Sequence, residues 1–190
     1  MDIINCSWTT PAVNDNLRNA INEVGGSALV FCAGYDEPYY SDETYPASYP
    51  TAISVAAATA RGRRRVEAPS QVDLLVLGED IEVTGPQYLR TSAKVASGSS
   101  VATAFASGLA SMLLVYCRIY DQETGMWKQY RRKEVMLQLF KLMQPGWSRN
   151  LNYVDPGFLF RNKFTRDGRP TDNVSQCFRG VQQLQTWLQR

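Results

Sequence analysis

Apolar runs of strand length alternate with amphipathic segments along the first 120 residues of the chain, and their order predicts an α/β fold. Residues 28–32 and 52–58 are almost continuously apolar, which is typical of strands buried on both faces. Residues 3–8 form a shorter apolar strand, and residues 11–24 repeat apolar side chains at helical spacing before Gly25-Gly26 ends the helix. Strand, helix and strand in this order predict a right-handed parallel unit.

The pattern continues beyond this unit with one more short strand and a long apolar helix. Residues 74–77 read as a strand, residues 78–95 as an irregular segment with a hairpin, and residues 100–119 as a helix that is apolar nearly all round. Residues 132–143 form an amphipathic helix. We therefore expect a mostly parallel sheet with helices on both faces, built by residues 1–145. Residues 146–190 are expected to be an extension that packs on this domain or trails from it, with a short strand at 157–160 and a helix at 177–188.

The start of the long helix carries the candidate chemistry. Gly98 permits a tight turn, and Ser99 and Ser100 are residue types that favour the N-terminus of a helix. No charged residue occurs from Val101 to Tyr116, so the helix is expected to lie in the core. Free N–H groups and the helix dipole favour negative charge at such an end, which suits the stabilisation of an oxyanion. An ordinary capped core helix has the same local pattern.

Four segments in order resemble segments of the subtilisin-like serine proteases (subtilases). Gly98-Ser99-Ser100-Val101-Ala102 resembles the nucleophile segment Gly-Thr-Ser-Met-Ala, and Ile3-Ile4-Asn5-Cys6-Ser7-Trp8 resembles the strand Val-Ile-Asn-Met-Ser-Trp. The stretch from Tyr45 to Ala57 is similar to the family segment Tyr-Pro-Ala-x-Tyr-Pro…Ile-x-Val-x-Ala. The stretch from Val72 to Ile81 is similar to the family segment Val-Asp-Val-x-Ala-Pro-Gly-x-x-Ile. The resemblance covers roughly residues 1–145. It implies the α/β fold of that family, represented by its C-terminal half.

The resemblance also implies roles for particular residues. Ser100 takes the nucleophile position, with its own N–H as one oxyanion donor. The position of the second donor depends on how Ala33-Gly34-Tyr35-Asp36-Glu37 is aligned with the family segment Ala-Gly-Asn-Glu. Aligning Ala-Gly places Tyr35 at the donor position, whereas aligning the glutamate with Glu37 places Asp36 there. We favour the second alignment slightly. A tyrosine hydroxyl donates a hydrogen bond, whereas an ionised aspartate repels the developing charge. The segment Ser7-Trp8-Thr9 matches the strand edge that binds substrate backbone, so a polypeptide would add there as a strand.

The chain contains no histidine, and this conflicts with a complete serine protease site. In this family the catalytic aspartate and histidine precede the Asn-x-Ser-Trp strand, with which this chain almost begins. The Pro-His pair that usually follows the nucleophile is replaced by Ala104-Phe105. Loss of the histidine alone costs about a million-fold in turnover. We therefore expect the chain alone to be inactive, and a separate or preceding N-terminal half-domain with the aspartate and histidine to be the partner that would complete it.

Composition adds few constraints. The net charge of +2 gives no reason to expect nucleic acid, and the alanine, serine and glycine content of residues 97–117 favours a core helix over a membrane span. No cofactor and no metal site is expected, because histidine is absent and the four cysteines are scattered, which favours buried free thiols. The start of the chain lacks the pattern of a signal peptide, so a cytoplasmic location is expected.

Two other readings compete with a truncated peptidase. The first is a pseudoprotease that has kept the packing motifs and lost the chemistry, and that serves as a protein-binding or scaffold module. Ala104, Phe105 and the altered segment around Asp36 favour it. The second is an unrelated α/β domain with chance motif matches, which would lack a glycine turn into a buried helix at Ser100.

Overall fold

The structure is a computed structural model of the 190-residue chain. It describes residues 1–34, 36, 43–65, 71–84, 94–120, 125–145, 152–157, 163–164 and 170–171. In chain order its elements are β1 (Ile3–Cys6), α1 (Asp15–Gly25), β2 (Leu29–Ala33), β3 (Ala52–Ala58), β4 (Leu74–Leu77), β5 (Ile81–Val83), β6 (Lys94–Ala96), α2 (Ser99–Tyr120), the 3₁₀ helix η2 (Met126–Arg131), α3 (Lys133–Lys141), β7 (Tyr153–Val154), β8 (Lys163–Phe164) and β9 (Pro170–Thr171).

Five strands form one parallel sheet in the order β1-β2-β3-β4-β7. All five residues of β2 are buried, as are all but one of β3, which explains why these strands read as continuous apolar runs. The predicted parallel α/β sheet is therefore confirmed. β5 and β6 pair antiparallel, which confirms the hairpin expected within residues 78–95.

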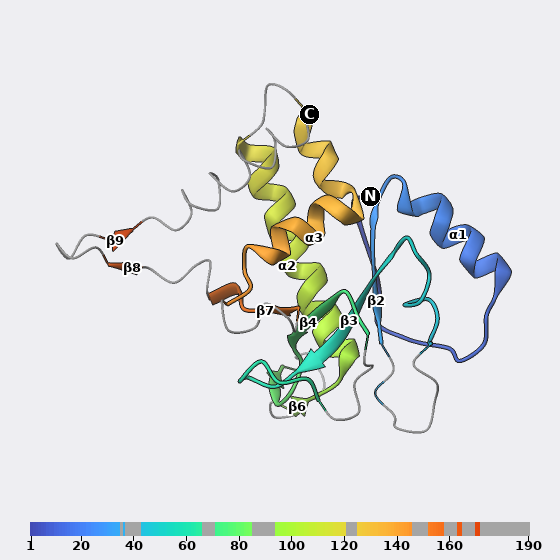
Figure 1. Cartoon of the computed structure of the whole chain (residues 1–190), viewed down its shortest axis with the longest axis horizontal. Helices are drawn as coiled ribbons and strands as arrows, with labels where there is room; N and C mark the ends of the chain where they lie inside the picture. The colour runs from blue at the N-terminus through green and yellow to red at the C-terminus, as the bar shows by residue number, and fades with distance from the viewer. Residues whose placement is uncertain are drawn as a thin grey trace.

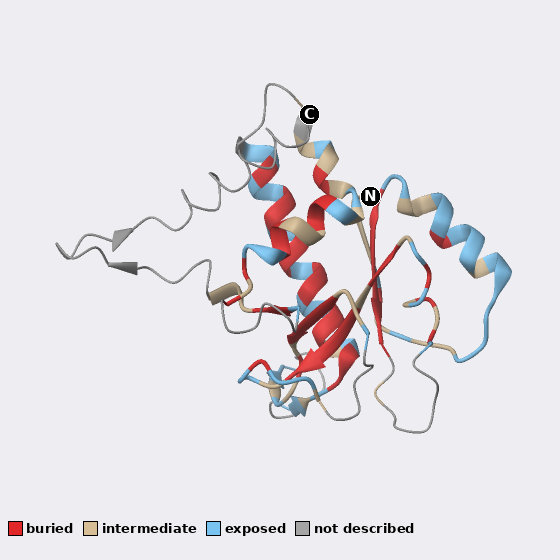
Figure 2. Cartoon of the chain, in the orientation of Figure 1, coloured by how far each residue is buried: buried red, intermediate tan, exposed pale blue. Residues whose placement is uncertain are grey.

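Helices cover both faces of this sheet (Figure 1). On one face α2, η2 and α3 pack on side chains such as Phe31, Val55 and Val76 and form the main core. On the other face α1 packs through Ile21 on Val30 and its neighbours. Figure 2 shows the buried residues concentrated in the strands and on one side of α2, while most of α1 is exposed. Successive strand residues thus serve opposite cores, as the two-residue period of a strand requires.

Two parts of the chain differ from the expectation, and a third is not described. The helix predicted for residues 11–24 begins at Asp15, because the side chain of Asn14 accepts a hydrogen bond from the Leu17 N–H and caps it (3.0 Å). η2 and β7 were not predicted, and β7, which pairs with β4, lies in the extension expected after residue 145. The helix predicted at 177–188, and most of the strand predicted at 157–160, lie outside the described residues.

Candidate active site

Gly98 forms the turn that leads into α2. Its φ of 137° lies in a region that side chains with a Cβ rarely adopt, and a Cβ built there would lie 3.0 Å from the Oδ2 atom of Asp36. The Gly98 N–H donates to the carbonyl of Gly78 (2.7 Å), and its own carbonyl accepts from the Val101 and Ala102 N–H groups (3.1 Å each). The predicted glycine turn is therefore present, and any other residue there would be strained.

Asp36 lies at the N-terminus of α2. Its Oδ2 accepts a hydrogen bond from the Ser99 N–H and its Oδ1 accepts one from the Ser99 hydroxyl. Ser99 is fully buried, and its Oγ also accepts from the Ala57 N–H of β3 (3.2 Å). A carboxylate from the end of β2 thus caps the helix, where the free N–H groups and the dipole favour negative charge. Of the two registers, only Asp36 is described, because Tyr35 lies outside the described residues.

Ser100 lies one residue further along the helix, and its side chain is exposed. Its Oγ donates to the carbonyl of Ser7 (3.0 Å), directly after β1. The Ser7 Oγ lies 3.1 Å from the Ser100 carbonyl and 2.7 Å from the Oδ1 of Asn5. One hydroxyl hydrogen serves only one of these two acceptors at a time. The structure thus brings two of the predicted site residues, Ser7 and Ser100, into contact.

The remaining predicted binding residues continue the chain after Ser7 without a described hydrogen bond to Ser100. Trp8 is 48% exposed, and Thr9 is partly exposed. The next residue, Thr10, exchanges two backbone hydrogen bonds with Tyr45 (2.7 and 2.9 Å). This short bridge pairs the residue that follows the Ser7-Trp8-Thr9 segment with Tyr45.

The chemical capacity of the site follows from these contacts. The acceptor of the Ser100 hydroxyl is a carbonyl oxygen, which cannot take up a proton as a general base does. Among the described residues, none accepts a hydrogen bond from the Ser100 N–H, so this group remains available to a negatively charged oxygen. The neighbouring Ser99 N–H is already held by Asp36. The site thus offers an exposed hydroxyl and one backbone donor at a helix N-terminus.

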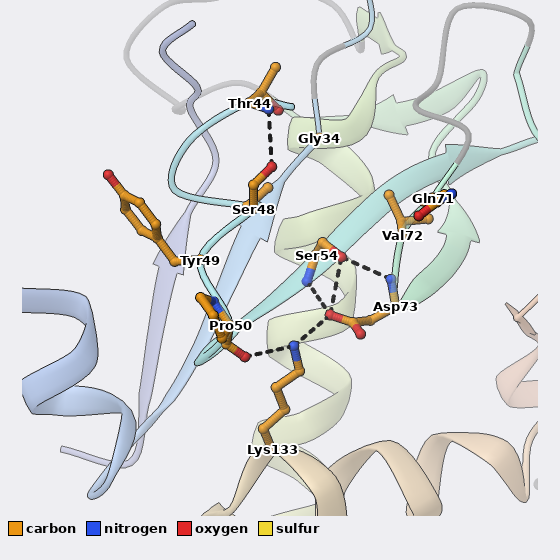
Figure 3. A pocket seen from close by; sticks show the side chains of 11 residues that line it. Gly34, Thr44, Ser48, Tyr49, Pro50, Ser54, Gln71, Val72, Asp73 and Lys133 are labelled. Atoms are coloured by element: carbon orange, nitrogen blue, oxygen red, sulfur yellow. Dashed lines mark hydrogen bonds and ion pairs between the residues drawn. The ribbon is translucent and has the colours of Figure 1, made fainter. Parts of the chain in front are cut away.

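A second polar cluster lines a cavity of about 220 Å³ on the sheet (Figure 3). The Oδ2 of Asp73 accepts hydrogen bonds from the N–H and the hydroxyl of Ser54 (2.9 and 3.1 Å). The Nζ of Lys133 forms an ion pair with the same oxygen (3.0 Å) and donates to the carbonyls of Pro50 and Ala52. These three acceptors match the three hydrogens of the ammonium group.

No sequence pattern singled out this cluster, because its members come from β3, from the segment before β4 and from the start of α3. The pair Val72-Asp73, part of the family resemblance, was the only sequence feature that pointed to this cluster. It did not indicate that Ser54 and Lys133 would contact Asp73. Figure 3 shows the Lys133 and Asp73 side chains pointing toward each other beneath Ser54. The cluster links three elements of the core, and its geometry is that of a structural contact.

Cys6 and Cys32 form a buried pair of free thiols on neighbouring strands, and Cys117 is a third buried free thiol. The hydrogen bond from the Cys32 thiol lowers the pKa of Cys6 to about 7, against the opposing effect of burial. The same contact, together with burial, raises the pKa of Cys32. The expectation of buried free thiols is confirmed for these three cysteines, while Cys177 lies outside the described residues.

Comparison with known proteins gave consistent matches. A model of the subtilase family matches residues 1–148. Subtilisin from Bacillus pumilus and Subtilisin E from Bacillus subtilis (strain 168) are each 29% identical over 120 residues, which is 60% of this chain and 42% and 31% of those proteins, respectively. The chain thus spans less than half the length of these relatives.

Two solved structures share the fold over most of this chain. The prenylagaramide maturation protease PagA superposes with a TM-score of 0.60 at 25% identity, covering 81% of this chain and 59% of that one. The S218A mutant of the protease domain of PatA superposes with a TM-score of 0.63 at 24% identity, covering 84% of this chain and 58% of that one. More than a third of each solved chain therefore has no counterpart here.

Proposed function

The chain belongs to the subtilase family of serine proteases, and from this premise we propose that Ser100 is the nucleophile of a peptide-hydrolysing site that the chain builds only in part. The observation that carries the proposal is the exposed Ser100 hydroxyl at the N-terminus of α2, against the carbonyl that ends the β1 segment. The substrate is a polypeptide, bound as an added strand along Ser7-Trp8-Thr9. Attack of the hydroxyl on the scissile carbonyl would place the oxyanion near the Ser100 N–H.

The missing parts of the reaction define the partner. The Ser100 proton needs an acceptor during attack, and the chain has no histidine to supply it. A polypeptide that carries an aspartate and a histidine of the subtilase type would supply both the base and the group that orients it. This polypeptide either precedes residue 1 in the same protein or is a separate protein. The chain alone is then a weak hydrolase at best, about a million-fold below the completed site.

Peptide hydrolysis tests this proposal. The 190-residue chain is assayed with a fluorogenic peptide library, alone and together with a polypeptide that contains Asp-Gly and His-Gly-Thr segments of the family. We expect hydrolysis only in the combined sample, and its loss in Ser100→Ala. Turnover at an enzyme-like rate by the chain alone, or combined activity that survives Ser100→Ala, would refute the assignment.

One observation favours a second function, that of a protein-binding module without catalysis. The Asp36 carboxylate lies against the Ser99 N–H, at the helix end where a hydrolase gathers donors for an oxyanion. A fixed negative charge there opposes the developing charge of a tetrahedral intermediate. As a binding module, the chain completed by its partner would bind peptides along Ser7-Trp8-Thr9 without cleaving them. Asp36→Asn removes the negative charge and is expected to restore part of the peptide-hydrolysing activity.

A further inference from the structure

Cys6 and Cys32 lie opposite each other on two neighbouring strands. Cys6 is the last residue of β1, and its partner in the parallel register with β2 is Cys32. Both side chains belong to the buried cluster between the sheet and α1, so they leave their strands on the same face. Matching residues of neighbouring strands lie about 4.8 Å apart, within the range of about 4.4–6.8 Å between the Cα atoms of disulfides. The backbone therefore already holds this pair at a separation that permits a bond.

The two thiols are chemically unequal. The Cys32 thiol donates a hydrogen bond to Cys6 and lowers the pKa of Cys6 to about 7, whereas the same contact and burial raise the pKa of Cys32. Near neutral pH, about half of Cys6 is therefore thiolate, which is the nucleophilic form of cysteine. Cys6 is also 6% exposed, while Cys32 is fully buried. A small oxidant thus meets Cys6 first, and Cys32 is placed to bond to it afterwards.

We propose that Cys6 and Cys32 are a redox-active pair, which a peroxide oxidises to a reversible disulfide. The Cys6 thiolate attacks one peroxide oxygen, so that an S–O bond forms, the O–O bond breaks, and the released hydroxide takes up a proton to become water. The Cys32 sulfur then attacks the Cys6 sulfenic acid; an S–S bond forms, and the hydroxyl group leaves with the Cys32 proton as water. The two thiols lose two electrons in total, and the peroxide receives them. An external thiol such as glutathione reopens the bond by exchange.

The bond would move the segment that contacts Ser100. The Cβ atoms of a disulfide lie about 3.8 Å apart, which is about 1 Å closer than the spacing of the strands. Closing the bond therefore draws β1 and β2 together at Cys6, and the next residue is Ser7, whose carbonyl accepts from the Ser100 hydroxyl (3.0 Å). A disulfide that strains its surroundings is easily reduced, which is typical of regulatory rather than structural bonds. The pair thus links the redox state of the surroundings to the position of the Ser7 carbonyl.

Peptide mapping of the oxidised chain tests the proposal directly. The folded 190-residue chain is treated with hydrogen peroxide, unfolded in the presence of an alkylating agent, and digested with trypsin. Cleavage after Arg18 separates Cys6 from Cys32, so their disulfide appears as one cross-linked pair of peptides. Cys117, a buried thiol of α2 that is 3% exposed, is the matched control.

We expect the Cys6–Cys32 cross-link to exceed any product that contains Cys117 at least tenfold, and to disappear when excess reduced glutathione is added. This measurement uses the unsubstituted chain and therefore does not depend on the folding of a variant. Cys6 and Cys32 that both remain open to alkylation after peroxide treatment, or a cross-link that forms only in urea, would overturn the proposal.

Two single variants test the order of the steps. Cys32→Ser keeps a hydroxyl donor beside Cys6 but lacks the second thiol, so Cys6 should accumulate as a sulfenic acid that dimedone traps. In Cys6→Ser, dimedone labelling of Cys32 should be at least tenfold lower. Circular dichroism checks that both variants are folded, and equal labelling in the two would contradict the assignment of Cys6 as the attacking thiol. These readouts follow sulfur chemistry alone, so they are independent of whether Ser100 hydrolyses peptides.

Discussion

Replacing Asp36 by alanine removes the carboxylate that holds the start of α2. The Ser99 N–H and hydroxyl lose their acceptor at a fully buried residue. Hydrogen bonds to charged groups contribute about 1.5–3 kcal/mol each, and the helix dipole adds about 0.3–1 kcal/mol. Since the hydroxyl is able to rotate toward another acceptor, we expect a total loss of about 2–4 kcal/mol in the free energy of unfolding.

Urea unfolding followed by circular dichroism measures this loss. With a slope of about 2 kcal/mol per molar urea, the midpoint of Asp36→Ala should fall by about 1–2 M. Asp15→Ala is the matched control, because Asp15 also lies in the first turn of a helix but is 73% exposed in its ion pair with Arg18. That variant should lose less than about 1 kcal/mol. Equal midpoints for the two variants, with unchanged slopes, would refute the capping role.

Further predictions concern the turn, the second polar cluster and the thiol pair. Gly98→Ala should destabilise the fold through its positive φ, whereas Gly108→Ala, in open space on α2, should stabilise it by about 0.5–1 kcal/mol in thermal unfolding. Lys133→Met should cost about 1–3 kcal/mol in the same assay, because it removes the cation paired with Asp73 and the donor to two carbonyls. The lowered pKa of Cys6 should make the fold more stable as pH rises from about 7 toward 9. The raised pKa of Cys32 should reverse that gain above about 9, and Cys6→Ser should abolish the rise; a flat profile in the unmodified chain would contradict the thiol hydrogen bond.

The strands and the long helix could be predicted because each produces a repeating signal in sequence. β3 and β4 were predicted with the bounds that the structure gives them, since their runs are almost wholly apolar and are bounded by threonine, aspartate or glycine. β7 has two residues, too few for any period to be detected. η2 follows a 3₁₀ path whose three-residue repeat is masked by its mixed polar and aromatic side chains.

The candidate site could be predicted only where its residues are adjacent in the sequence. Gly98, Ser99 and Ser100 follow one another, so the turn and the helix start could be read directly. The Asp36–Ser99 contact joins residues that are 63 positions apart, and it depends on β2 ending beside the start of α2. The sequence alone allowed Tyr35 or Asp36 near the helix, but it contained nothing to show that the carboxylate binds Ser99 rather than facing Ser100.

Fluorophosphonate labelling, mapped by mass spectrometry, tests the assignment of Ser100 most directly. The chain is treated alone and after assembly with the polypeptide that carries the aspartate and histidine. The account predicts a covalent phosphonate on Ser100 only in the assembled sample, with no label on the buried Ser99 and none after Ser100→Ala. Assembly without any label on Ser100, or label on another serine, would contradict it.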